Sequence, residues 1–273
     1  MLYEPNATAS LAETSPIGNA APRIQPARDH AWHFPRFEIA GDSALLLDFA
    51  AGTESSADAQ ALARVLALDR ALMRFPPPGF IEAIPAYASL LVAYDPAVID
   101  ADAMATAIAR LLTEPDRTPV SRRRWRVPVA YGGAHGADLE HVAERLATTP
   151  EHVIAAHAGA RYTVAMLGFL PGFAYLAGLP EALAVPRRST PRQRVAAGGI
   201  AIGGAQTAIG SIEGPSGWHQ IGRTPVRTFD CRREPVTFLE TGDEIEIVPI
   251  DAVQFAELEA SADSGHLIAE RLA

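Results

Sequence analysis

The sequence predicts an α+β protein in which an N-terminal α/β domain precedes a β-barrel. Up to about residue 131, short strands alternate with two segments of helical apolar periodicity. From residue 162 to residue 249, short apolar stretches are separated by Gly and Pro, a spacing typical of barrels. With 48% hydrophobic and 20% charged residues, the chain has enough apolar side chains to bury a core.

The N-terminal elements follow from local patterns. Residues 37–49 (FEIAGDSALLLDF) predict two strands joined by a Gly-Asp turn. Residues 58–75 carry apolar side chains at three- and four-residue steps and predict a helix, which Pro76 ends. The remaining predicted elements are strands over 79–86 and 88–95, a helix over 101–112 and a strand over 125–131. Strand–helix–strand–strand–helix–strand is the order of a ferredoxin-like domain.

The C-terminal half begins with two predicted helices, over 137–147 and 150–158, before the barrel strands. Residues 254–260 and 267–272 also have helical patterns. We therefore predict a flexible extension (1–35), a ferredoxin-like domain (36–118), a barrel domain (119–260) and a C-terminal tail (261–273).

Charge and cysteine content narrow the function classes. The formal net charge is −9, which disfavours nucleic acid and anionic membranes as partners. The single cysteine, Cys231, excludes an internal disulfide and fits a reducing compartment. No apolar run is long enough for a membrane span, and the N-terminal residues lack the pattern of a signal peptide, so we expect a cytoplasmic protein.

Two motifs predict a binding site. Residues 168–176 (GFLPGFAYL) form either a rigid loop that presents aromatic rings and backbone amides to a ligand, or a barrel corner with core aromatics. Residues 186–194 (PRRSTPRQR) hold four arginines, which suit a carboxylate or a phosphate because guanidinium groups bind oxyanions in a fork. The alternative is a solvated basic loop that pairs with carboxylates of this acidic chain.

Two further motifs, residues 197–210 and 214–225, hold other candidate binding residues. Residues 197–210 (AGGIAIGGAQTAIG) lack a P-loop or dinucleotide pattern, but their glycines allow close backbone approach. In this motif Gln206 either binds a lactam or carboxamide edge or is an exposed strand residue. In residues 214–225 (GPSGWHQIGRTP), Arg223 is a candidate anion contact, and His219 is either an acid or base or a surface residue.

Standard catalytic machinery is missing from the sequence. We find no Cys/His cluster at zinc spacing, no HExxH motif and no GxSxG elbow. We therefore assign no catalytic residue and no metal site, and we predict that another polypeptide completes the active site.

Together these segments resemble the family of 5-oxoprolinase B subunits, also described as allophanate hydrolase subunit 1 or carboxyltransferase subdomain C/D. The resemblance covers residues 37–250, with Ala174 and Ser216 as mild departures from the usual motif. It rests on the strings VPVAYGG, RYTVAMLGFLPGFAYL, PRRSTPRQRVAAG, GGAQTAI, GPSGWHQIGRTP and LETGDEIEIVPI.

The resemblance implies a cyclophilin-like barrel and one component of an ATP-dependent enzyme. The family complex converts 5-oxoproline, ATP and water to glutamate, ADP and phosphate, with a C subunit and an A subunit as partners. It implies ATP, with Mg²⁺, as a co-substrate and no tightly bound cofactor. The motif positions that we assign to the cleft with the C subunit are Phe169, Pro171, Gly172, Phe173, Arg188, Ser189, Arg192, Gln206, Trp218 and Arg223.

Two alternative functions stay open at the level of sequence. One is a Kip-type regulator that inhibits a histidine kinase by binding it, which needs an exposed apolar patch and no turnover. The other is a component of a urea or allophanate carboxyltransferase, which needs a biotin carrier. The family resemblance alone does not decide among them.

Overall fold

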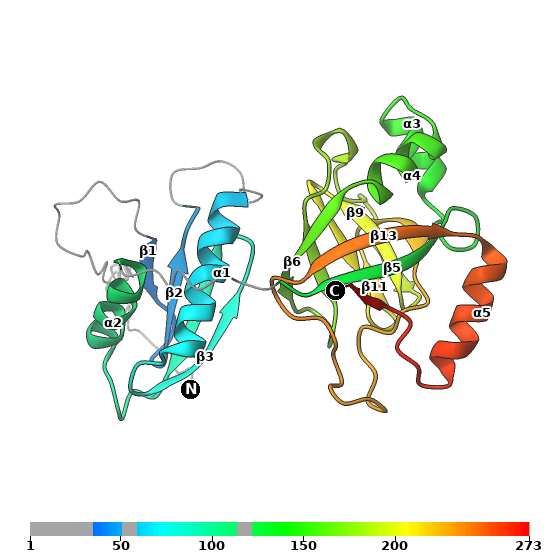
Figure 1. The fold of residues 1–273 in the computed structure, drawn as a ribbon. Coiled ribbons are helices and arrows are strands. Elements are labelled where there is room, and N and C mark those ends of the chain that lie inside the picture. The colour runs from blue at the N-terminus through cyan, green and yellow to red at the C-terminus, as the bar shows by residue number, and fades with distance from the viewer. Residues whose placement is uncertain (1–34, 51–58, 114–121, 273) are drawn as a thin grey trace, which may run out of the picture.

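The computed structural model of the chain describes residues 35–50, 59–113 and 122–272. The predicted flexible extension, residues 1–35, lies outside these ranges except for Pro35. The described structure is α+β, as predicted. A four-stranded sheet with two helices precedes a β-barrel with its own surrounding helices (Figure 1).

The N-terminal sheet is antiparallel and has the strand order β1-β2-β4-β3. Both helices pack on it and bury one apolar cluster, which includes Leu45, Leu47 and Met104. The elements are β1 (Arg36–Ile39), β2 (Ala44–Asp48), α1 (Ala59–Arg74), β3 (Phe80–Pro85), β4 (Ser89–Tyr94) and α2 (Ala101–Thr113).

One predicted strand of this unit lies elsewhere. Residues 125–131 do not complete the N-terminal sheet but belong to β5 (Arg124–Tyr131) in the barrel, so the predicted ferredoxin-like strand order is wrong at its last strand. β1 occupies the sheet edge beside β2 instead. A hairpin turn at Gly41, with φ of +72°, joins these two strands, and so short a connection costs little loop-closure entropy.

Helix α1 has two apolar stripes. Ala61, Val65, Leu68 and Leu72 face the N-terminal sheet, at the three- and four-residue spacing of one helix face. Leu62 and Leu66 form a second stripe that packs with residues of the barrel strands β6 and β7. The hydroxyl group of Tyr87 also donates a hydrogen bond of 2.8 Å to the carbonyl of Leu176 in the barrel. These contacts join the two parts of the chain.

The barrel closes through the pairing of β12 with β5. The closed ring has seven strands in the order β12-β9-β10-β7-β6-β13-β5, and β13 and β5 are parallel. Alternate side chains from these strands fill the centre, among them Val127, Ile202 and Ile247. Besides β5, the strands of the ring are β6 (Arg161–Leu167), β7 (Ala174–Ala177), β9 (Gly199–Gly203), β10 (Gln206–Ile209), β12 (His219–Arg223) and β13 (Glu244–Ile250).

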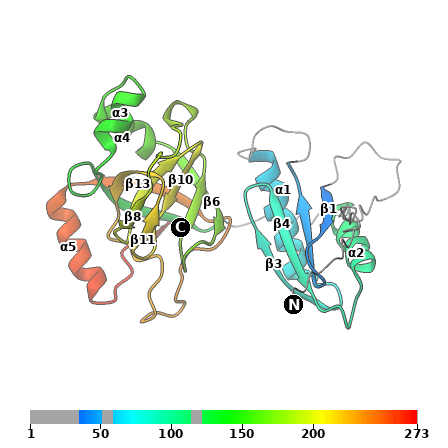
Figure 2. The ribbon, with the colours of Figure 1, turned by 180° about the vertical axis from the view of Figure 1, so that it is seen from behind.

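The other elements surround the ring. A two-stranded ribbon, β8 with β11, lies beside it, and Figure 2 shows the two strands next to each other. Helices α3 and α4 lie together at one end of the barrel (Figure 1). These elements are α3 (Leu139–Arg145), α4 (Pro150–Ala158), the 3-10 helix η1 (Glu181–Leu183), β8 (Arg192–Val195), β11 (Gly214–Ser216), α5 (Ala252–Asp263) and β14 (Glu270–Leu272).

The C-terminal residues differ from the prediction. Residues 267–272, predicted to be helical, contain the strand β14, which pairs with residues 124–126 of β5. Residues 261–273, expected as a separate tail, also contain the end of α5. Residues 270–272 form a strand because the first residues of β5 have a free backbone edge. On that edge β12 pairs only with the last two residues of β5.

A buried histidine links α4 to the barrel interior. His157 Nε2 donates a 3.0 Å hydrogen bond to the hydroxyl of Thr207, which in turn donates to the carbonyl of Ala201. His157 Nδ1 accepts a 2.8 Å hydrogen bond from the hydroxyl of Tyr131. The ring is therefore a neutral imidazole with both nitrogens satisfied, and burial lowers the pKa of His157 to about 3.

This histidine predicts a stability that declines with acidity. Below pH 6.5 the unfolded chain binds a proton at His157 that the folded protein excludes, so the free energy of unfolding should fall by up to about 1.4 kcal/mol per pH unit. Urea unfolding between pH 7 and pH 4 measures this slope. His157→Gln should flatten it, whereas His152→Gln, on the exposed side of α4, should not. Identical slopes in both variants would contradict the role of His157.

Among the residues that the structure describes, no helix combines the length and the apolar character that a membrane span requires.

Candidate functional site

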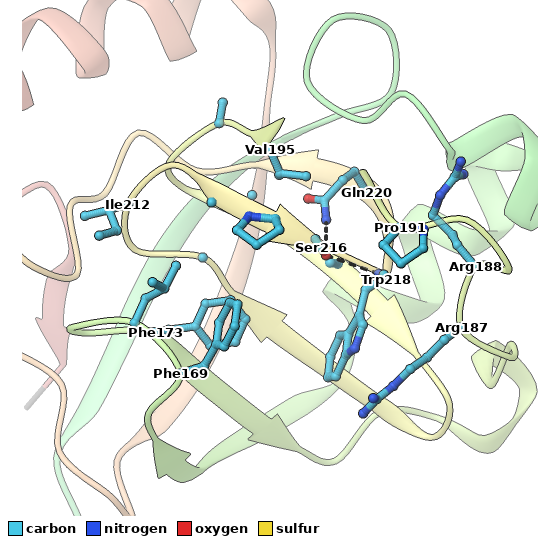
Figure 3. Close-up of a pocket in the computed structure, with 18 of the residues that line it drawn as sticks. Phe169, Phe173, Arg187, Arg188, Pro191, Val195, Ile212, Ser216, Trp218 and Gln220 are labelled. Carbon is cyan, nitrogen blue, oxygen red and sulfur yellow. Dashed lines mark hydrogen bonds between the residues drawn. The ribbon is translucent and has the colours of Figure 1, made fainter. Parts of the chain in front are cut away.

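An open cleft of about 400 Å³ lies on the barrel wall (Figure 3). Its lining comes from four segments, residues 169–175, 187–196, 199–201 and 210–220. All four motifs that the sequence indicated therefore contribute to one hollow. The fold brings them together because β9 pairs with both β10 and β12, while the ribbon of β8 and β11 lies alongside.

Four aromatic side chains form one side of the cleft, which we call the aromatic wall: Phe169, Phe173, Tyr175 and Trp218. Their ring centroids follow one another at 5.6, 4.8 and 5.8 Å, mostly in edge-to-face or tilted arrangements. Such spacing is typical of attractive aromatic pairs. The wall gives the cleft an apolar surface of rings inclined to one another.

The corner before β7 sets the position of the wall. Phe169 has a φ of +71°, which is unusual for a non-glycine residue, and its side chain is 62% exposed at the rim. Gly172 also has a φ of +71°, and a Cβ at this position would lie 2.8 Å from the Cβ of Phe229. Gly172, which we predicted as a site residue, is not among the residues that line the cleft. Its absence of a side chain lets the corner pack closely on the barrel.

Trp218 owes its position to a second glycine. A Cβ at Gly203 would lie 2.7 Å from two carbons of the indole, so the ring packs directly on the backbone of β9. The indole is 8% exposed. This confirms that the glycines of residues 197–210 serve close approach between chain segments.

The arginines of the basic loop have different partners. Arg188 and Arg192 both bind the carboxylate of Asp138, through hydrogen bonds of 2.9 Å for Arg188 and 2.5 and 2.7 Å for Arg192. Arg187 lines the cleft, stacks over Trp218 at 5.4 Å and has no carboxylate partner among the described residues. The sequence prediction placed the anion-binding charge on Arg188 and Arg192. Arg188 also lines the cleft, and of the two lining arginines Arg187 is the one without a carboxylate partner among the described residues.

Asp138 holds the basic loop against the barrel. Its carboxylate also accepts a 2.8 Å hydrogen bond from the backbone N–H of Gln220, and its side chain is 4% exposed. Burial by itself would raise the pKa of Asp138, but hydrogen bonds from Arg192 and Gln220 hold it below its usual range. Sequence reasoning missed Asp138, although it did weigh pairing of the basic loop with the chain's own carboxylates. Arg188 and Arg192 do pair with a carboxylate of the chain, and their role in anion binding stays a prediction.

Ser216 and Gln220 form the polar part of the cleft. The hydroxyl oxygen of Ser216 accepts hydrogen bonds from the backbone N–H of Trp218 (3.1 Å) and from Gln220 Nε2 (3.4 Å), as Figure 3 shows. Gln220 is 8% exposed, and its Oε1 has no hydrogen-bond partner in the described structure. A buried amide oxygen without a partner is uncommon, so this part of the cleft has unused hydrogen-bonding capacity.

Other predicted site residues do not line the cleft. Gln206 lines a separate shallow hollow beside Tyr87. Arg223 forms a 2.8 Å ion pair with Glu259 of α5 and donates to a backbone carbonyl. Ser189 is exposed on the loop and is absent from the lining, as are Pro171 and Arg192. Any role of these residues in binding stays a prediction.

His219, which we weighed as an acid or base, is buried behind the basic loop. Its Nε2 donates a 3.0 Å hydrogen bond to the carbonyl of Pro186, and burial lowers its pKa. His219 is also absent from the cleft lining. Cys231 is exposed and lies outside the cleft as well.

Comparison with known proteins decides the family. Residues 35–239 match the family "carboxyltransferase domain, subdomain C and D". A relative from Bacillus subtilis, named as the B subunit of 5-oxoprolinase, is 38% identical over 226 residues, which are 79% of this chain and 92% of the relative. This chain belongs to the family of 5-oxoprolinase B subunits. A second member of the family, from Haemophilus influenzae, is 48% identical over 126 residues, covering 46% of this chain and 59% of its own length.

Two solved structures resemble the fold of this chain. The crystal structure of TTHA0988 has a TM-score of 0.66 at 36% identity, over 77% of this chain. The matched region spans 40% of the length of that protein. Urea amidolyase of Kluyveromyces lactis has a TM-score of 0.73 at 18% identity, over 92% of this chain and 17% of its own, and shows the fold alone.

The carboxylate of Asp138 provides a test of how the cleft is held. Asp138→Asn removes the single negative charge that Arg188 and Arg192 share, and should lower the free energy of unfolding by about 2–4 kcal/mol. Glu213→Gln is the matched control, because Glu213 forms an exposed ion pair with Arg194, and it should cost less than about 1 kcal/mol. Urea unfolding measures both. Equal losses would contradict the central position of Asp138.

Proposed function

We propose that this chain is the B subunit of an ATP-dependent 5-oxoprolinase, which converts 5-oxoproline, ATP and water to glutamate, ADP and phosphate. The observation that carries the proposal is the similarity to a relative named as the B subunit of 5-oxoprolinase, over 92% of that relative's length. In this function the chain acts with a C subunit and an A subunit, and the open cleft is its contribution to a shared active site.

The composition of the cleft supports a shared site. Among the described residues that line it there is no Asp, Glu, His or Cys, so the lining supplies binding groups and no carboxylate, imidazole or thiol for proton transfer. What it supplies is the aromatic wall, the guanidinium groups of Arg187 and Arg188, and the polar pair Ser216 and Gln220. A partner surface that covers the open side would add the missing acid–base groups and exclude water.

ATP fits this donor set only in part. A guanidinium group suits a phosphate, and an aromatic wall suits a nucleobase or another planar group. The lining holds no carboxylate to bind Mg²⁺, which prefers oxygen ligands, so we assign no metal ligand to the described cleft residues. When bound, ATP would supply the phosphoryl group that activates the lactam.

Neither alternative function gains a specific observation. The exposed rim residues Phe169 and Ile212 suit any protein partner, whether a kinase or another component of an enzyme complex. The similarity to urea amidolyase, at 18% identity, concerns the fold alone. The 5-oxoprolinase function therefore remains the proposal.

Reconstitution tests this function. Mixed with the C and A subunits, the chain should support release of glutamate from 5-oxoproline that depends on ATP, and each protein alone should release none. Coupled assays of glutamate and ADP measure both products, and an ATP-free mixture is the control. Turnover by this chain alone would contradict a shared site, and absence of turnover by the full mixture would contradict the proposed function.

A further inference from the structure

Two side chains of the cleft lining, Tyr175 and Arg187, also line a second hollow. This is the shallow hollow beside Tyr87, with a volume of about 360 Å³. The N-terminal unit (β1 to α2) contributes Asp48 and Ser89 to it as well as Tyr87. Tyr175 and Arg187 therefore have the cleft on one side and residues of the N-terminal unit on the other.

Tyr87 joins the N-terminal unit to the barrel strand that carries Tyr175. Its hydroxyl donates a hydrogen bond of 2.8 Å to the carbonyl of Leu176 in β7, and Leu176 directly follows Tyr175. Tyr87 is 7% exposed, and its burial, followed by the interaction with Tyr175, raises its pKa. The phenol of Tyr87 therefore keeps its proton at neutral pH and remains a hydrogen-bond donor to β7.

Tyr175 packs in two apolar clusters. In the first cluster it packs with Leu62, Leu66 and Tyr87, at the contact of the N-terminal unit with the side of the barrel that β6 forms (Figure 1). In the second cluster it packs with Trp218, and the centroids of the two rings lie 5.8 Å apart in an edge-to-face arrangement. Because closely packed side chains do not shift independently, a displacement of Tyr175 in the first cluster is transmitted to the indole in the second.

We propose that Tyr87 is a positioning residue of the cleft, which acts through Tyr175 to hold the indole of Trp218 in place. The guanidinium of Arg187 lies over this indole at 5.4 Å, so the position of the indole also affects the position of the cation. Tyr87 itself is not among the residues that line the cleft. The proposal deepens the proposed function, on which its effect on turnover rests, and gives the N-terminal unit a part in the active site.

The variant Tyr87→Phe tests the position of the indole in the full chain. It keeps the ring and removes the hydrogen bond to Leu176. When 5-fluorotryptophan replaces the three tryptophans, the fluorine resonance of Trp218 should shift, because its shielding depends on the position of the Tyr175 ring. The resonance of Trp125, which packs in the barrel interior, should not shift. The variant Trp218→Phe identifies the Trp218 resonance.

Tyr94→Phe is the matched control for this substitution. Tyr94 is also a buried tyrosine of the N-terminal unit, and it packs in the cluster between the sheet and its two helices. This variant should leave the Trp218 resonance where it is in the wild-type chain. An unchanged Trp218 resonance in Tyr87→Phe, or an equal shift in both variants, would overturn the proposal.

A double-mutant cycle tests whether Tyr87 acts through Tyr175. Tyr175→Leu removes the ring that packs in both clusters. If this ring is the link, adding Tyr87→Phe to Tyr175→Leu should cause no further shift of the Trp218 resonance. A further shift as large as that in the wild-type background would overturn the proposal, because Tyr87 would then affect the indole without Tyr175.

Turnover tests the consequence for the reaction. In the complex with the C and A subunits, Tyr87→Phe should lower kcat/KM for 5-oxoproline about fivefold, which corresponds to ~1 kcal/mol, the usual contribution of one hydrogen bond. Tyr94→Phe should change it less than about twofold. If Tyr87 only joined the two parts of the chain, Tyr87→Phe would lower the urea midpoint of unfolding and leave the Trp218 resonance and kcat/KM unchanged. That result would contradict a positioning role.

The two readouts separate this proposal from the proposed function. If the wild-type complex releases no glutamate, the function fails, and the fluorine resonance of Trp218 in the free chain still decides whether Tyr87 positions the indole. If the complex is active and the resonance does not move in Tyr87→Phe, the function stands and the positioning role is wrong.

Discussion

The buried carboxylate of Asp138 is the constraint on which the site depends. It lies directly before α3 and binds Arg188, Arg192 and the backbone of Gln220, so a single side chain joins a helix, a loop and a barrel strand. Unpaired burial of this charge would be costly, and three sets of donors offset that cost. The loop that carries Arg187 is held at the next residue in two ways. The side chain of Arg188 binds Asp138, and its backbone N–H donates a hydrogen bond to the carbonyl of Gly217.

Backbone packing at glycines complements this electrostatic constraint. Gly203 brings the indole of Trp218 onto β9, and Gly172 brings the corner before β7 onto Phe229. Side chains at these two positions would push the aromatic wall outwards. The wall and the basic loop are thus positioned by different forces, close packing on one side and buried ion pairing on the other. The cleft between them is preorganised, which lowers the entropic cost of binding a small ligand.

Much of this organisation could be predicted from the sequence, since local patterns report local structure. The periodicity of residues 58–75 predicted α1 within one or two residues, and the Gly- and Pro-rich motifs predicted the segments that line the cleft. Which strands pair with one another in a sheet was harder to predict. The alternation of residues 125–131 predicted a strand with one buried face, but it did not tell which of two sheets it would join. The short strand over residues 270–272 was mistaken for a helix for the same reason, because its pairing with β5 is not local.

The sequence by itself therefore determined the α+β class, the family and the four motifs of the cleft, because these depend on residue order and spacing. Only the tertiary structure decided which of the arginines pair with a carboxylate of the chain. Arg187, Arg188 and Arg192 are equivalent by composition, and their difference arises from Asp138, about fifty residues away in the chain, whose single carboxylate binds two of them. Electrostatic pairing depends on distance in space, and the fold alone sets that distance.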